Sequence, residues 1–149
     1  MAAQAFKIYN LSKKKIGNTS LNLAATVFRM TLHTSASNAA TLTLGVYNSV
    51  TNEVAEANGY SSSGKALTSE VWTVGASAKS YKFDFDDVVW TGTGGTIPNI
   101  KFACVWISAA ASANRHLLAF CSLTSAQFTL AQNNTLTLQI NALGCFTMQ

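Results

Sequence analysis

The segment from Asp84 to Ser108, DFDDVVWTGTGGTIPNIKFACVWIS, constrains the fold more strongly than any other part of the sequence. It predicts a strand, a glycine-rich turn and a second strand, with Gly92 to Gly95 forming a hairpin connection. From Ile100 to Ile107 both faces of the second strand are apolar, which is typical of a central strand covered on each side. We expect an opposing sheet on one face, a loop or a partner chain on the other, and Trp106 in the core.

Polar and apolar residues alternate in several other stretches, and a period of two places each apolar set on one face of a sheet. The stretch from His116 to Leu123 resembles the central strand. Further strands are predicted at 26–34, with Phe28, Met30 and Leu32 on one face, at 80–86, with Tyr81, Phe83 and Phe85 facing the core, and at 135–142, with Leu136, Leu138 and Ile140 on one face.

The spacing of these strands indicates the fold class. The 149 residues suffice for one domain, and a hydrophobic content of 48% excludes a disordered chain. Strand-length pieces at roughly ten-residue spacing favour a sandwich or a barrel. We therefore predict an all-β fold, a single antiparallel β-sandwich domain over residues 1–149 with a jelly roll as one strand order and at most one short helix. Thr41 to Ala57 is expected to form that helix or an irregular loop, and Ala109 to Asn114 an exposed loop.

Charge is sparse, at 11% of residues, and the net charge is +4. A polar surface with few charges suits a protein that packs against neighbours. Lys13, Lys14 and Lys15 are interpreted as a solvated turn between strands. Because nucleic-acid binding usually needs a broader basic face, we expect no specific nucleic-acid partner. We expect no membrane partner either, since no stretch reaches the ~18 apolar residues of a membrane helix.

Two motifs could hold a ligand, and each has a simpler structural interpretation. Asp84, Asp86 and Asp87 are the only clustered carboxylates. A calcium loop needs more oxygen ligands and usually an internal glycine, so an exposed strand edge is the simpler interpretation. The glycines at 92–95 lack the lysine of a phosphate-binding P-loop. We therefore predict no metal site and no cofactor.

The histidines and cysteines do not form a recognisable catalytic motif. His33 or His116 could activate a cysteine as a nucleophile. Cys104 and Cys121 instead lie in apolar runs typical of inert core thiols. With Cys145 the chain has three cysteines, an odd number with neither a disulfide framework nor a zinc-site spacing. We predict that the protein has no catalytic residues and is not an enzyme.

The aromatic residues leave a different function open. Tyr60, Trp72 and Trp90 lie beside predicted loops, where aromatic side chains could face a ligand such as a glycan. The alternative interpretation is that they are ordinary core residues.

The N-terminal segment is the best candidate for contact with a partner. Residues 1–11 could form an arm that reaches a neighbour, or an ordinary first strand. Phe6, Ile8 and Leu11 supply its apolar side chains, and with Lys13, Lys14 and Lys15 they form the predicted partner-binding set. The opening residues MAAQAFKIYNLS lack the apolar core of a secretory signal, so we expect synthesis in a cytoplasm.

Five landmarks, in order along nearly the whole chain, resemble a family of small virion-associated proteins of tailed bacteriophages. They are a first strand with a lysine-rich turn (Phe6 to Asn18), a Phe-x-Met-x-Leu strand (Phe28 to Ser35), the Asn-Glu-Val and Asn-Gly-Tyr pair (Asn52 to Gly64), the acidic strand with its glycine turn (Phe83 to Ile107), and a closing Thr-Leu-Thr-Leu strand (Thr135 to Phe146). The chain departs from the family at Ala109 to Asn114, where an Asp-rich loop is common.

The resemblance implies a non-enzymatic structural role. The expected protein is a capsid decoration or cement protein on the surface of the icosahedral head, made in the bacterial host cytoplasm. Its partners would be the phage major capsid protein and copies of itself in a trimer or another symmetric oligomer. The alternatives are a tail, neck or fibre-associated virion protein, or a glycan-binding module displayed on the virion.

Overall fold

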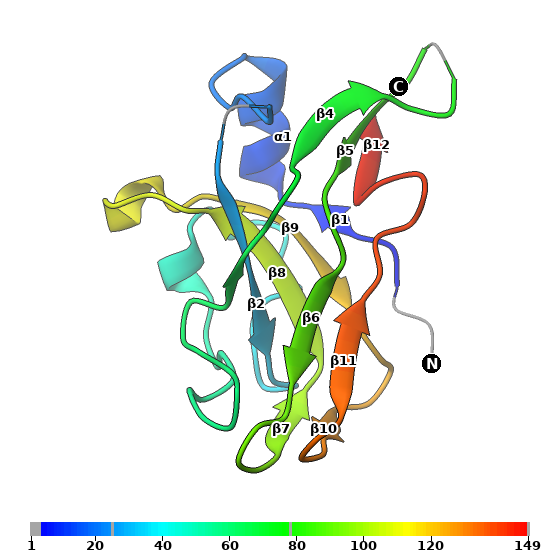
Figure 1. Cartoon of the computed structure of the whole chain (residues 1–149). Coiled ribbons are helices and arrows are strands. Elements are labelled where there is room, and N and C mark those ends of the chain that lie inside the picture. The colour runs from blue at the N-terminus through cyan, green and yellow to red at the C-terminus, as the bar shows by residue number, and fades with distance from the viewer. Residues whose placement is uncertain (1–3, 25, 78, 149) are drawn as a thin grey trace.

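A computed structural model describes residues 4–24, 26–77 and 79–148 (Figure 1). These residues form antiparallel sheets with one short α-helix, so the prediction of an all-β, sandwich-like fold is confirmed. The expected short helix or irregular loop at 41–57 is also confirmed, because it contains only a one-turn 3-10 helix, Tyr47–Ser49. The loop from Ala109 to Asn114 is largely exposed, as predicted.

The first layer is a five-stranded sheet in the order β1-β9-β8-β2-β3. Every neighbouring pair in it is antiparallel. Its strands are β1 (Lys7–Ile8), β9 (Leu117–Ser122), β8 (Phe102–Ile107), β2 (Phe28–His33) and β3 (Lys65–Ala66). Beyond Lys101, β7 (Ile97–Ile100) and β10 (Phe128–Leu130) extend the β8/β9 pair as a second ladder.

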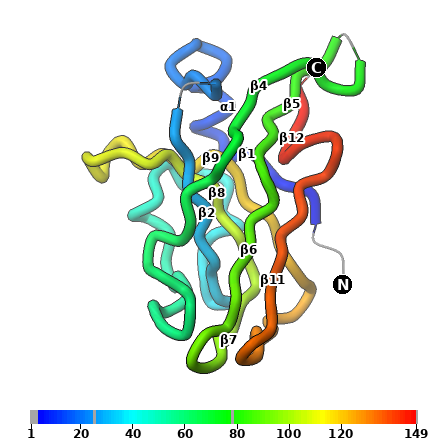
Figure 2. Tube along the Cα trace, viewed as in Figure 1, coloured from blue at the N-terminus to red at the C-terminus, as the bar shows by residue number. Residues whose placement is uncertain are grey.

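The second layer lies in front of the first in Figure 1 and is a long ribbon of two chain segments, 81–91 and 135–148. Figure 2 shows these two segments running side by side along the length of the molecule. The strands are β5 (Tyr81–Asp84) paired with β12 (Phe146–Met148), β6 (Val88–Thr91) paired with β11 (Thr135–Leu138), and β4 (Val71–Val74), which pairs with β5 at the edge.

The main core lies between the layers, and the alternation of the sequence explains it. Phe28, Met30 and Leu32 of β2 are fully buried and face the second layer, where the ring of Phe28 meets that of Phe83 edge-on at 5.0 Å. The expectation for Tyr81 is wrong, because its side chain remains 47% exposed. Tyr81 shares the face of Phe83, but it lies near the end of the ribbon, beyond the main core.

A second apolar cluster covers the opposite face of the first sheet. Trp106 of β8 is 2% exposed and stacks on Tyr47, with ring centroids 4.1 Å apart and planes 5° from parallel. Leu42, Leu44 and Val50 from the same covering loop pack on this cluster. The prediction of a central strand buried on both faces is confirmed, and a loop provides the second cover.

Two local predictions are wrong. The glycines at 92–95 do not form a hairpin, because β6 pairs with β11 whereas β7 pairs with β10. The lysines at 13–15 do not form a turn between strands, because they belong to helix α1 (Asn10–Gly17). One side of the helix faces the protein: Ser12 is buried, and its Oγ donates to the Leu117 carbonyl at 2.5 Å. Packing on β9 therefore stabilises a helix that has no capping side chain at its start.

Candidate functional site: an apolar groove at the open edge of the sandwich

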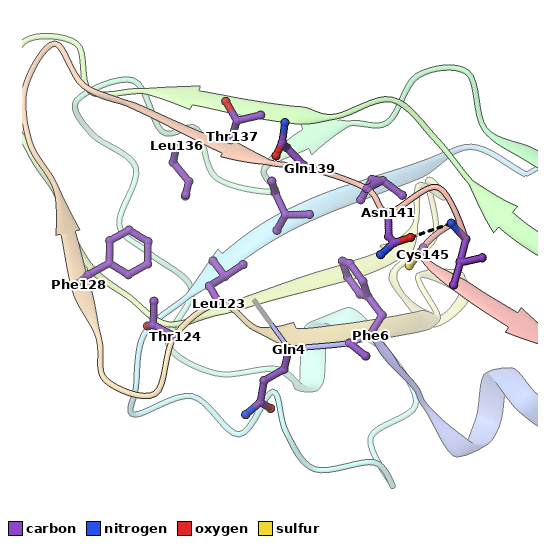
Figure 3. A pocket seen from close by; sticks show the side chains of 15 residues that line it. Gln4, Phe6, Leu123, Thr124, Phe128, Leu136, Thr137, Gln139, Asn141 and Cys145 are labelled. Atoms are coloured by element: carbon purple, nitrogen blue, oxygen red, sulfur yellow. Dashed lines mark hydrogen bonds between the residues drawn. The ribbon is translucent and has the colours of Figure 1, made fainter. Parts of the chain in front are cut away.

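A groove lies where the two layers part. It has a volume of about 740 Å³ and lies between the N-terminal segment, the connection from β9 to β10, and the chain from β11 towards β12 (Figure 3). A volume of several hundred Å³ is typical of a binding site. Both layers end here, because β1 is the last strand of the first sheet and β11 has β6 as its only paired neighbour in the described structure.

Apolar side chains from both layers form the wall of the groove. Phe6 and Leu123 come from the first-layer side, and Leu136 and Leu138 come from β11. Phe128, at the start of β10, closes one end, as Figure 3 shows. Phe6, Phe128 and Leu136 are only half-buried although they pack against the core. The groove therefore presents apolar surface that a bound segment could cover.

The polar groups around the groove are all uncharged. Gln4, Gln139 and Asn141 contribute amides and Thr137 a hydroxyl, and none of the lining side chains is an Asp, Glu, Lys, Arg or His. The side chain of Asn141 already has one hydrogen bond within the protein, because its Oδ1 accepts from the Leu143 backbone N–H at 2.9 Å. A charged occupant would find no counter-ion, so the groove favours a neutral one.

One edge of β11 has no neighbouring strand in the described structure, and this edge faces the groove. The N–H of Gly92 donates to the Asn134 carbonyl at 3.0 Å, which continues the β6/β11 ladder by one pair. Hydrogen-bonded pairs alternate in an antiparallel ladder, so Leu136 and Leu138 direct their backbone groups to β6. The backbone groups of Thr135 and Thr137 point to the open side. An extended peptide could pair with them by strand addition.

The predicted partner-binding residues lie in two places. Phe6 lines the groove and Ile8 packs against the core from β1. Residues 4–11 continue into β1 and α1, so among the described residues they form a first strand instead of a free arm; residues 1–3 lie outside the described structure. Leu11 is half-buried on α1, close to Gly45. Lys13 and Lys14 are exposed on α1, and neither these lysines nor Lys15 lines the groove.

The expected aromatic ligand surface is wrong for two of its three members. Tyr60 is 2% exposed and Trp90 is 1% exposed, so neither ring can stack on a glycan. Tyr60 packs in the main core, where its hydroxyl is satisfied: it donates to the Glu53 carboxylate at 2.6 Å and accepts from the Leu32 N–H at 3.0 Å. Trp72 is half-buried in β4 and stacks on Tyr81 at 5.8 Å.

The three clustered carboxylates point to different partners. Asp84 forms an ion pair with Lys82 at 2.6 Å, Asp86 accepts hydrogen bonds from Thr68 and Ser69, and Asp87 accepts from the Ile140 N–H. Among residues 4–24, 26–77 and 79–148, no three His, Cys, Asp or Glu side chains gather where they could hold a metal ion.

The thiols are poor nucleophiles in this structure. Cys104, Cys121 and Cys145 are all buried. Burial raises the pKa of Cys104 and of Cys121 to about 12, and it also raises the pKa of Cys145. Since the thiolate is the reactive form, these groups would react slowly near neutral pH.

The histidines also lack a catalytic arrangement with a thiol. Burial lowers the pKa of His33 to about 4, so its ring is neutral near pH 7. Its Nε2 lies 2.9 Å from the Thr31 hydroxyl, and no hydrogen bond joins either described histidine to a cysteine thiol.

Comparison with known proteins gives no family assignment: no family model, curated protein or solved structure matches the chain. Across the described part of the chain, no helix has the length and apolar character needed to cross a membrane.

The sequence pattern identified only some of the groove. The alternation predicts Leu136 and Leu138 as apolar strand residues, and Phe6 belongs to the predicted N-terminal arm or first strand. No sequence pattern joins them with Leu123, Phe128 and Leu143 in one site. Leu143 directly follows the last predicted strand and precedes Gly144, and a leucine beside a turn glycine is the only signal that the sequence offers for it. The structure leaves this leucine 53% exposed.

Proposed function

We propose that this protein is a non-enzymatic structural protein of a tailed-bacteriophage virion, a decoration or cement protein that binds the outside of the icosahedral head. The observation that carries the mechanism is the neutral, apolar groove beside the free edge of β11. The order of sequence landmarks supports the phage assignment. The groove supports binding to a neighbour by an extended segment, for which the proposed partner is the major capsid protein.

Strand addition would explain how such a protein strengthens a shell. A segment of a capsid subunit lying along Thr135 and Thr137 would form main-chain hydrogen bonds, and its alternate side chains would cover Phe6 and Leu136. Because the protein would bind the assembled shell better than the free subunits, binding would stabilise the shell by mass action.

Purified particles test the location. Quantitative mass spectrometry and an electron-microscopy map of the virion should place copies of the protein over the head lattice, in the hundreds per particle. Copies restricted to the tail or neck, in dozens or fewer, would instead establish the alternative of a tail, neck or fibre-associated protein. Absence from the virion would contradict both assignments.

A charge placed in the groove tests the binding mode. Leu143 lines the groove and is 53% exposed, so Leu143→Asp should fold normally. A bound segment would bury the new carboxylate without a counter-charge. The affinity of the variant for shells prepared without this protein, measured by co-sedimentation, should therefore fall by about tenfold or more. Val27→Asp is the matched control, because Val27 is 58% exposed and does not line the groove. Equal binding of the two variants would exclude the groove as the contact.

A further inference from the structure

Strand β4 has a free edge that differs from the edges of the first sheet. Its only paired neighbour in the described structure is β5. The outermost strands of the first sheet, β1 and β3, are two residues long, which limits pairing with another chain. By contrast, β4 has four residues, VWTV, with no proline, charge or bulge to protect it.

Exposed apolar side chains gather at this edge. Val71 is 42% exposed, Val74 is 50% exposed, and Tyr81 on the neighbouring strand is 47% exposed. Val74 pairs with Tyr81 across the two strands, and Trp72 stacks on the Tyr81 ring. Half of the six large hydrophobic side chains that are exposed among the described residues therefore belong to one corner, where β4 and β5 meet (Figure 1).

The backbone groups available at this edge can be assigned from the ladder with β5. The Gly75 N–H donates to the Ser80 carbonyl at 2.8 Å, so Gly75 and Ser80 form a hydrogen-bonded pair. Such pairs alternate along an antiparallel ladder, so Val71 and Thr73 also direct their backbone groups to β5. The N–H and C=O groups of Trp72 and Val74 consequently point away from the sheet, without a strand partner.

We propose that two copies of this protein associate through β4, in antiparallel pairing about a two-fold axis at Thr73, to form one continuous six-stranded sheet. This register places Trp72 opposite Val74 of the second copy, and the reverse. Both residues have free backbone groups, so each Trp72–Val74 pair forms two hydrogen bonds. The N–H and C=O groups of Trp72 and Val74 then all have partners in both copies. A second copy is the occupant that fits, because the same short strand supplies both halves of the contact.

The charges flanking β4 favour this antiparallel arrangement. The strand itself is uncharged, so the two copies do not repel each other there. Glu70 precedes the strand and is half-buried, with one carboxylate oxygen accepting a hydrogen bond from the Phe28 N–H at 3.3 Å, and the turn that follows the strand carries the exposed Lys79. Pairing about Thr73 places Glu70 opposite Ala76 of the second copy, in the turn that bears Lys79. The inference goes beyond the proposed function and does not depend on it, since it concerns a different edge of the molecule.

Sedimentation velocity over a range of protein concentrations tests for the dimer. The full chain should shift from monomer to dimer as concentration rises. Val74→Lys places a charge opposite Trp72 of the second copy, next to the two-fold axis, and should weaken dimerisation by at least about tenfold. Val89→Lys is the matched control, because Val89 is 38% exposed on β6 and not part of β4. A wild-type chain that stays monomeric, or a Val74→Lys variant that dimerises like the control, would overturn the proposal.

A disulfide tests the register. Thr73 lies on the two-fold axis in a non-hydrogen-bonded pair with its own copy, where Cα atoms are about 4.5 Å apart, close enough for a disulfide. Thr73→Cys should therefore form a covalent dimer under mild oxidation. The three native cysteines are buried and do not compete. Val71→Cys is the control, because the two introduced side chains of the dimer would lie about four residues apart along the paired strands, too far apart for a disulfide. Equal cross-linking of both variants, or of neither, would overturn the Thr73 register.

Discussion

Gly64 occupies a backbone position that has no room for a side chain. Its φ is +62°, in the left-handed region, and a Cβ atom there would lie 1.8 Å from the Met30 carbonyl oxygen. Gly94 also has a positive φ, +79°, but a Cβ atom there would meet no atom within 4 Å. The two glycines therefore separate the effect of backbone strain from the effect of a steric clash.

We expect Gly64→Ala to cost more than about 3 kcal/mol of unfolding free energy, because β2 must shift to make room. Gly94→Ala should cost about 1 kcal/mol, the strain of a left-handed alanine alone. Urea unfolding of both variants measures the difference. Similar losses would show that the loop at Gly64 moves away from β2 without penalty.

His33 links folding to pH because its ring is buried. Burial lowers its pKa in the folded protein to about 4, while the unfolded chain has a value near 6.5. The unfolded state therefore binds the proton first as pH falls, and the contribution of His33 to stability is lost between about pH 6.5 and pH 4. The loss amounts to about 3 kcal/mol.

Urea unfolding at several pH values should show this loss, and His33→Gln should show a smaller decrease over the same interval. The comparison uses the slope of unfolding free energy against pH, so a general loss of stability in the variant does not affect the result. A variant with the same pH dependence as the wild type would assign the effect to groups other than His33.

The loop that contains Tyr47 acts as a cover for the central strand. Its ring stacks on Trp106, and its hydroxyl donates to the Glu53 carboxylate. Tyr47→Phe keeps the stacking and removes the hydrogen bond, which should cost about 1 kcal/mol. Tyr47→Ala also removes the ring and should cost about 3 kcal/mol, with a red shift of tryptophan fluorescence as Trp106 meets water. Equal stability of the two variants would show that the stacking contributes nothing.

The alternation of side chains predicted the strands because burial on one face imposes a period of two. Where the alternation stops, from Ile100 to Ile107, two apolar faces predicted a strand covered on both sides, and the burial of every β8 residue up to Trp106 confirms it. The pattern did not predict α1, because three adjacent lysines obscured the half-buried or buried positions Leu11, Ser12, Lys15 and Ile16, which recur at helical spacing.

The glycine turn shows a second limit of local patterns. Residues 92–95 indicate that the chain turns, but the strands on either side pair elsewhere. The groove has the same origin. Phe6 and Leu136 are 130 positions apart in the sequence, and the layers that bring them together are set by packing across the whole chain.

The three thiols report on global opening of the fold. All are buried, and burial raises each pKa. A thiol reagent at neutral pH should label none of them rapidly in the native protein and all three after denaturation. Val71→Cys provides the control, with one fast thiol at an exposed position. A single fast thiol in the native wild-type protein would contradict the burial of that cysteine.

The position of β1 has a consequence for how the chain is made. Lys7 pairs with Phe120, and the Gln4 N–H donates to the Ser122 carbonyl. The first strand thus leaves the ribosome long before its partner exists, and the first sheet cannot be completed until most of the chain has been translated. Contacts so distant in sequence slow folding. During that interval Phe6 and Ile8 are free to bind chaperones, so the rate of translation and the supply of chaperones should affect the yield of folded protein.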